Sequence, residues 1–189
     1  MILSRRLVFA ILATIIATAA IEIWMGRLFF GPDGQFAWVE MDIWSSGQSQ
    51  RVLDPYSLSH IIHGFLFYGL LHLVARRLPM GTRFACAVAL EAGWEILENS
   101  PLIIDRYRAV TIAQGYVGDS VLNSLSDIVM AAWGFLLAWK LRVSTSVVLI
   151  VATELLMVAA IRDNLTLNIV MLAYPIEAIR LWQLEGRPY

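Results

Sequence analysis

The stretch LVFAILATIIATAAIEIW (Leu7–Trp24) is apolar almost throughout, and Glu22 is its single charged residue. A helix needs about 20 mostly apolar residues to cross the hydrocarbon core of a bilayer, so this stretch predicts a membrane-spanning helix. The arginines at 5–6 before it and the small residues ATA at 17–19 also fit a signal peptide. We favour an uncleaved anchor because the apolar run continues to Trp24, and we expect Glu22 to reach the interface.

The composition of the whole chain agrees with a membrane location. It has 189 residues, of which 59% are hydrophobic and 15% charged, whereas soluble domains have about 45–50% apolar and about 25% charged residues. These values exclude an ordinary soluble domain and a disordered chain. The net charge of −1 gives no global field to recruit nucleic acid. Cys86 is the only cysteine, which excludes an internal disulfide and a multi-cysteine metal site.

Further apolar runs follow the first one. Together they predict an all-α fold, a polytopic transmembrane helical bundle of about six spans that forms a single integral membrane domain over residues 1–189. Pro175 and Glu177 interrupt the last run, where a proline kinks a helix without excluding a span. The runs are Leu58–Ala75, Phe84–Leu97, Ser120–Trp139, Val143–Ile161 and Asn164–Trp182.

Basic residues between the runs predict the orientation. If the spans alternate, one side collects most of them, and cytoplasmic loops carry an excess of lysine and arginine. Both termini are therefore predicted to be cytoplasmic. The residues on that side are Arg5, Arg6, Arg76, Arg77, Arg83, Lys140, Arg142, Arg180 and Arg187.

Two segments on the other side are long. Residues 26–57 contain the turn signal Gly31-Pro32-Asp33-Gly34 and mix aromatic with acidic residues, which predicts an outer cap on the membrane surface; a loose loop is the alternative. Residues 99–118 place apolar residues before charged ones and predict an interfacial segment.

Ionisable and polar residues gather in three of the runs. Each ionisable residue costs about 2.5–3.5 kcal/mol at the centre of a membrane helix, so each needs a partner. Their depth predicts that they meet in the outer half of the bilayer, with Arg106 and Arg108 just above. Such a cluster is either a functional site or a structural network that joins the helices. Its members are His60, His63, Glu91, Glu95, Glu98, Asp119, Asn123 and Asp127.

Residue chemistry suggests roles within this cluster. His63, Glu95 and Asp119 are the predicted catalytic residues, as proton-transfer groups or metal ligands. A divalent metal is one candidate cofactor, since two histidines and several carboxylates form a plausible ligand set. Arg106, Arg108 and Asn123 are predicted to bind an anionic substrate group. The candidate metal ligands are His60, His63, Glu95, Glu98 and Asp127.

Two resemblances add to these predictions. The stretch 116–127 with Gly134 resembles the signature of VanZ-like membrane proteins, in which an intramembrane acid precedes an arginine-bearing loop and an Asp-x-x-x-Asn helix. The matching residues are Glu91 or Glu95, Arg106 or Arg108, Asp119, Asn123 and Gly134. Over nearly its full length, and most clearly at 59–64 and 93–100, the chain resembles a small family of bacterial multi-pass inner-membrane proteins of unknown function. The resemblances imply a bacterial inner membrane and a role at the cell envelope.

Three hypotheses for function remain. The leading one is a polar site that acts on or binds an envelope lipid; as an enzyme it would catalyse hydrolysis or transfer at a phosphate or ester. A small proton-coupled transporter is the second, supported by Glu154 near the middle of its run. A non-catalytic scaffold or assembly factor is the third. The lipid bilayer is the expected partner in all three cases.

Overall fold

The computed structural model describes residues 3–186, and all regular secondary structure in that range is helical except for one isolated β-bridge between Val39 and Leu53. The all-α prediction is thereby confirmed. In chain order the helices are α1 (Arg5–Trp24), α2 (Ser57–Val74), α3 (Met80–Glu98), α4 (Pro101–Val110), α5 (Val121–Lys140), α6 (Val143–Ile161), α7 (Leu165–Ala173) and α8 (Glu177–Leu184).

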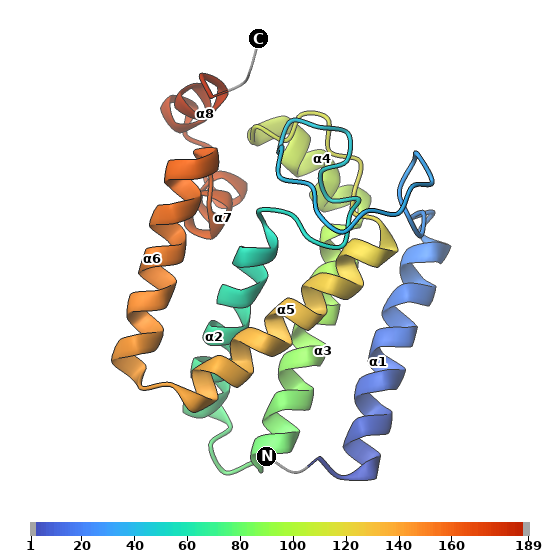
Figure 1. Ribbon diagram of the computed structural model, residues 1–189, viewed down its shortest axis with the longest axis vertical. Helices are drawn as coiled ribbons and strands as arrows, with labels where there is room; N and C mark the ends of the chain where they lie inside the picture. The colour runs from blue at the N-terminus through green and yellow to red at the C-terminus, as the bar shows by residue number, and fades with distance from the viewer. Residues whose placement is uncertain (1–2, 187–189) are drawn as a thin grey trace.

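Four helices are long and apolar enough to cross a membrane: α1, α2, α5 and α6. The helix α3 has a comparable length of 19 residues, but its glutamates and Arg83 make it less apolar. In Figure 1, α1, α2, α3 and α6 run up and down the molecule, and α5 crosses obliquely in front of α2 and α3. The structure thus supports several candidate spans, while the predicted number of about six is not confirmed.

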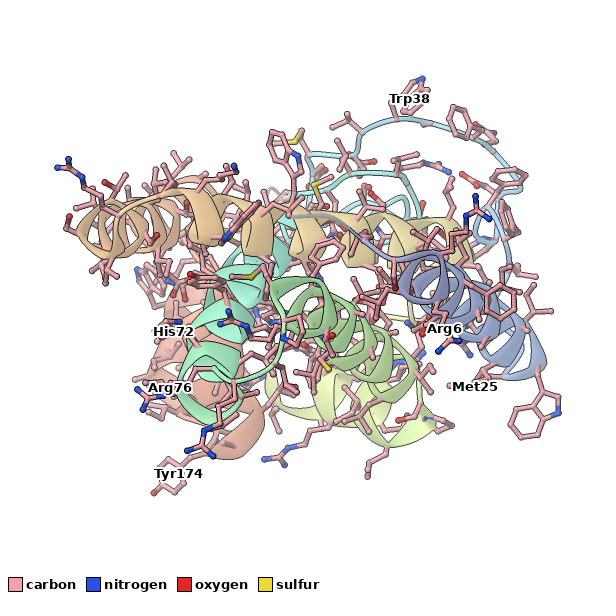
Figure 2. The ribbon with its side chains drawn as sticks, turned by 90° about the horizontal axis from the view of Figure 1, so that it is seen from below. Arg6, Met25, Trp38, His72, Arg76 and Tyr174 are labelled. Atoms are coloured by element: carbon pink, nitrogen blue, oxygen red, sulfur yellow. The ribbon has the colours of Figure 1, made fainter. Side chains whose placement is uncertain are left out.

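The run predicted as the sixth span forms two short helices. The helix is interrupted at residues 174–176. Tyr174 takes an extended conformation there (φ −142°, ψ 90°), which suits a residue before proline. Tyr174 projects outward at this break (Figure 2). At 1.5 Å per residue, α7 and α8 each cover only about 12–14 Å. Both lie in the half of the molecule that carries segment 26–57, far from the start of α1 (Figure 1). The prediction that both termini share one side is therefore not confirmed.

The helices α2 and α5 cross at two glycines. A Cβ atom on Gly64 would overlap the backbone of Ala131, and one on Gly134 would overlap the backbone of Ile61. Small residues let helix backbones approach in this way. Phe135, which is completely buried, packs beside the crossing. The close approach brings the polar faces of α2 and α5 together with α3.

The segment 26–57 is held over the start of α5. The backbone N–H of Ser120 donates to the carbonyl of Ser49 at 2.9 Å, and the side-chain amide of Gln50 donates to the carbonyl of Gly118 at 2.8 Å. Trp38 projects from its outer edge (Figure 2), with 68% of the residue exposed. These bonds fix the segment against residues 118–120, and we call residues 26–57 the cap.

Candidate functional site

A cavity of about 100 Å³ lies between the cap, α2, α3, α4, α5 and the start of α7. It exceeds the roughly 10–15 Å³ that one water needs by several times. Its wall carries acids, histidines and aromatic rings, and no lysine or arginine of the described residues lines it. Its polar and aromatic residues are Trp44, Gln48, Ser49, Asp54, Tyr56, Ser59, His60, His63, Trp94, Glu98, Tyr107, Thr111, Tyr116, Asp119, Asn123, Asp127, Asp163 and Asn168.

Two histidines of α2 meet one glutamate of α3 at the inner side of this cavity. His60 Nδ1 lies 2.5 Å from Glu91 Oε1, and His63 Nδ1 lies 3.1 Å from both oxygens of the same carboxylate. Residues three apart on a helix share a face, which explains why both rings reach Glu91. The glutamate is fully buried. One atom from each of the three side chains lies within 4.8 Å of the others.

A second glutamate of α3 approaches the same histidine but is not hydrogen-bonded. Glu95 Oε1 lies 3.3 Å from His60 Nδ1, and both buried carboxylate oxygens of Glu95 have no hydrogen-bond partner. Glu98, one turn further, accepts a hydrogen bond from Tyr107. His60, Glu95 and Glu98 also bring one ligand atom each within 4.8 Å of one another. The predicted grouping of His60, His63, Glu95 and Glu98 is therefore present in space.

Asp127 of α5 completes the cluster from the opposite side. Its Oδ1 accepts a hydrogen bond from Ser57 Oγ at 3.0 Å, and its Oδ2 lies 3.8 Å from His60 Nε2, beyond hydrogen-bond length. We call His60, His63, Glu91, Glu95 and Asp127 the inner cluster. Its three carboxylates outnumber its two histidines, and like charges so close together cannot all stay ionised without protons or a cation.

Asp54, an acid of the cap in the cavity wall, accepts several hydrogen bonds. Asp54 accepts from the side chain of Gln48 and from the backbone N–H groups of Ser49, Tyr56 and Ser57, at 2.8–3.2 Å. Burial raises the pKa of Asp54 to about 6, and repulsion from Asp119 adds to the shift. This carboxylate is thus still ionised at neutral pH and anchors the turn that leads into α2.

Asp119 has fewer donors but is also fixed. Tyr116 O–H donates to its Oδ1 at 2.9 Å, and the side-chain amide of Asn99 donates to its Oδ2 at 3.0 Å. The backbone N–H of Asp119 donates in turn to Asn99 Oδ1 at 2.7 Å. Burial raises the pKa of Asp119. The structure therefore places this predicted catalytic residue in the cavity wall, bonded to its neighbours and apart from the inner cluster.

The two arginines predicted to bind substrate lie outside the cavity wall. Arg106 Nε donates to the carbonyl of Leu172 at 3.0 Å, and Arg108 Nε donates to the carbonyl of Tyr116. Asn123, the third predicted substrate-binding residue, lines the cavity, but its amide donates to the carbonyl of Arg51 at 2.9 Å. The structure thus brings only Asn123 of this set to the cavity.

Two acids differ from their sequence-based interpretation. Glu22, expected at the interface, is completely buried beside Ser124, because the face of α1 that carries it packs inward. Glu154 of α6 accepts hydrogen bonds from the backbone N–H groups of Leu165 and Thr166 at 3.1 and 3.0 Å. It satisfies donors at the start of α7, where helices leave N–H groups unpaired.

The sequence interpretation gave no ligand role to Glu91, although this glutamate holds both histidines. Its spacing of four residues from Glu95 placed it on the same helical face, and that signal could have included it. Tyr107 and Tyr116 were also missed: their rings pack at 5.4 Å in the cavity wall. No local pattern distinguishes them from interfacial tyrosines.

Comparison with known proteins places the chain among uncharacterised bacterial proteins. Residues 22–185 match the family model described as "Protein of unknown function (DUF2585)". The chain is similar to UPF0314 proteins of Rhizobium johnstonii (48% identity over 174 residues, 92% of this chain and 89% of the relative) and Sphingopyxis alaskensis (49% over 174 residues, 92% and 93%). It is also similar to one of Novosphingobium aromaticivorans (51% over 176 residues, 90% and 89%). No solved structure matches.

Proposed function

Since the chain belongs to the DUF2585 family, whose description states no activity, we propose a function from the site itself. The protein is an integral protein of the bacterial inner membrane. Its inner cluster binds a divalent metal ion, and the cavity above that ion receives the head group of an envelope lipid. The reaction is hydrolysis or group transfer at a phosphate or ester of that lipid. The observation that carries this proposal is the convergence of His60, His63 and Glu91 beside the unpartnered Glu95.

The charge distribution supports the membrane orientation. At the end of the molecule opposite the cap, the connections 75–79 and 141–142 contain arginines and no acid, and Lys140 ends α5. An excess of basic residues marks a cytoplasmic side. The cap, α4 and the cavity mouth would then face the outer leaflet. This orientation places the N-terminal start of α1 inside and α8 outside.

The spacing of the ligand atoms fits a metal ion. Atoms bound at 2.0–2.1 Å in tetrahedral geometry lie about 3.3 Å apart. The histidine nitrogens and the carboxylates of Glu91 and Glu95 are separated by 2.5–3.3 Å, so small movements suffice to admit the ion. Two histidines with one carboxylate leave coordination positions open. A cation also offsets the excess negative charge of the inner cluster.

The remaining residues supply a base and a position for the substrate. Bound divalent metal would lower the pKa of a coordinated water and polarise a phosphate or carbonyl oxygen. Glu95 has no hydrogen-bond partner and lies beside His60, so its carboxylate is free to accept a proton. His63 and Asp127 line the cavity, where they would face the reacting group.

The transporter hypothesis is less well supported. Its main argument was the position of Glu154 near the middle of a predicted span, but this carboxylate accepts two backbone hydrogen bonds from the start of α7. The carboxylate of Glu154 therefore has a structural role.

The resemblance to VanZ-like proteins stays a prediction. Of its matching residues, the acids Glu91, Glu95 and Asp119 lie in or beside the candidate site, and Gly134 lies at the crossing of α2 and α5.

Metal content by mass spectrometry on detergent-purified protein tests the proposal. We expect about one divalent metal ion per chain in the unmodified protein and its loss in His63→Ala. His72→Ala is the matched control, because His72 lies on the same helix, exposed and stacked on Tyr68 outside the site. Glu91→Gln provides a second test if His63→Ala does not fold.

Size-exclusion profiles must match before the contents are compared. A folded, unmodified protein without stoichiometric metal, even after incubation with zinc, manganese or iron, would overturn the metal centre. Equal metal in His63→Ala and His72→Ala would place the ion elsewhere.

A further inference from the structure

The arginines of the cap, α4 and α8, and Arg162, lie in the same half of the molecule as the cavity but do not line it, and each already has a hydrogen-bond or ion-pair partner. Each donates to a backbone carbonyl or pairs with an acid elsewhere. The partners are Val117 for Arg27, Asp33 for Arg51, Leu172 for Arg106, Tyr116 for Arg108, Trp182 for Arg162 and Glu177 for Arg180.

The cavity wall instead offers hydrogen-bond acceptors with few donors. Glu98 receives a hydrogen bond from Tyr107, and Asp127 Oδ2 lies 3.8 Å from the nearest histidine nitrogen. Behind them, Glu95 is fully buried and unpartnered. A ligand group that enters here therefore meets the carboxylates of Glu98 and Asp127, each of which has one hydrogen bond from the protein and can accept more. A group that brings donors and positive charge would satisfy them.

Aromatic rings surround the same space. Tyr107 and Tyr116 pack edge to face at 5.4 Å between ring centroids, and Trp94 packs edge to face with His63 at 6.1 Å. All four residues line the cavity. Rings of this kind attract a cation placed over their faces. Carboxylates and rings thus favour the same type of ligand group.

We infer that the cavity recognises a primary ammonium group, carried by the head group of an aminophospholipid such as phosphatidylethanolamine. This inference rests on the proposed function for the place of the lipid, and it names the lipid class. A primary ammonium brings three N–H donors to the acceptors of Glu98 and Asp127, whereas a quaternary ammonium brings none. A head group with only negative charge would be repelled by the surplus carboxylates and would find no arginine in the wall.

A lipid is the favoured source of the ammonium because the helices that line the cavity also present apolar surface or are candidate membrane spans. Helix α4, which contributes Tyr107 to the wall, leaves Leu102 73% exposed. The helices α2 and α5, which also contribute to the wall, are candidate membrane spans. An acyl chain could therefore lie along these helices while the head group occupies the cavity. A small soluble amine has no use for that surface.

Binding of short-chain phospholipids to the full-length protein in detergent tests this inference. The series compares phosphatidylethanolamine, phosphatidylglycerol and phosphatidylcholine with soluble phosphoethanolamine. We expect phosphatidylethanolamine to bind about tenfold tighter than the other two lipids, the effect of one charge-assisted hydrogen bond. Glu98→Gln should reduce this preference to about threefold or less, since the amide lowers the negative charge beside the ammonium. Asp105→Asn, which changes an exposed acid of α4, should retain it.

Equal binding of the three lipids would overturn the inference, and so would an unchanged preference in a folded Glu98→Gln protein. If Glu98→Gln does not fold, the comparison of the three lipids on the unmodified protein still tests whether the cavity prefers a primary ammonium group. Binding of phosphoethanolamine as tight as that of the lipid would support ammonium recognition and overturn the lipid as its source. Metal content measured on the same samples separates the two proposals. Metal without a lipid preference contradicts only this inference, and a preference without metal contradicts only the metal centre.

Discussion

The inner cluster and the C-terminal segment α6–α8 both contain acids within apolar sequence, but the acids differ in how many hydrogen bonds they accept. Asp163, between α6 and α7, accepts hydrogen bonds from Tyr56 O–H and the side-chain amides of Asn168 and Gln183, each at 2.8–2.9 Å. Glu154 accepts two more from backbone N–H groups. In the inner cluster, Glu95 has no hydrogen-bond partner.

The difference teaches how a buried acid can be assigned a role. In an acid that accepts several hydrogen bonds, these bonds offset part of the cost of burying the ionised form, and no further ligand is needed. An acid without donors needs a proton or a cation, and keeping it there costs stability. The C-terminal acids hold elements together, while the inner cluster is arranged for a ligand that the protein itself does not supply.

The largest effect is expected from removing an acid that accepts several hydrogen bonds. Asp163→Ala leaves several buried donors without a partner, so the free energy of unfolding should fall by about 3–5 kcal/mol. Thermal unfolding in detergent measures this, with the exposed Glu185→Ala as control. An unfolding temperature equal to that of the control would contradict the structural role of Asp163.

The pH dependence of stability gives a somewhat smaller effect. Burial raises the pKa of Asp163 from 3.8 to about 6, so the folded state holds this proton more tightly than the unfolded state. The stabilisation is complete below pH 4 and is lost as the pH rises through about 6. Each such acid should therefore lower the stability by about 2–3 kcal/mol between pH 4 and 7.

Asp54, whose pKa is also raised to about 6, adds to the same trend. Chemical unfolding across this pH range provides the measurement. In Asp163→Asn the free energy of unfolding should fall about half as steeply between about pH 4 and 7. An unchanged pH dependence would show that Asp163 does not titrate in this range.

The crossing that assembles the inner cluster should tolerate no added atom. Gly64→Ala places a methyl group against the backbone of Ala131 on α5, and such overpacking costs about 1–3 kcal/mol. It should also displace His60 and His63 and lower the metal content. Gly69→Ala is the control, because nothing lies near its added Cβ. Similar stability of the two variants would show that the helices do not cross this closely.

The smallest change in stability is expected from the unpartnered acid. Glu95→Gln replaces a buried carboxyl group that has no hydrogen-bond partner with a neutral amide of similar shape, so the free energy of unfolding should stay within about 1 kcal/mol of its original value or rise. Metal binding, measured by titration after chelation, should nevertheless weaken. A loss of stability comparable to that of Asp163→Ala would remove the contrast between the two regions.

The sequence by itself determined the helical class, four of the six predicted spans as candidates, and the helical faces that carry the polar residues. Hydropathy and the 3.6-residue period depend on local sequence. They therefore placed His60 and His63 on one face, and Glu91 beside Glu95 on another. The break at Pro175 was visible as an interruption, but the turn of α7 and α8 into the half of the molecule with the cap was not.

The tertiary structure decided which of these polar groups meet. The close crossing at Gly64 and Gly134 sets the distance between α2 and α5, and only that distance makes Asp127 a neighbour of His60. Other tertiary contacts buried Glu22, gave Glu154 its hydrogen-bond donors and left Arg106 and Arg108 outside the cavity wall. Hydrogen-bond partners from distant segments cannot be read from one helix. Two acids that both lie in apolar sequence, such as Glu95 and Glu154, can therefore have different roles, one as a candidate ligand and the other as a structural anchor.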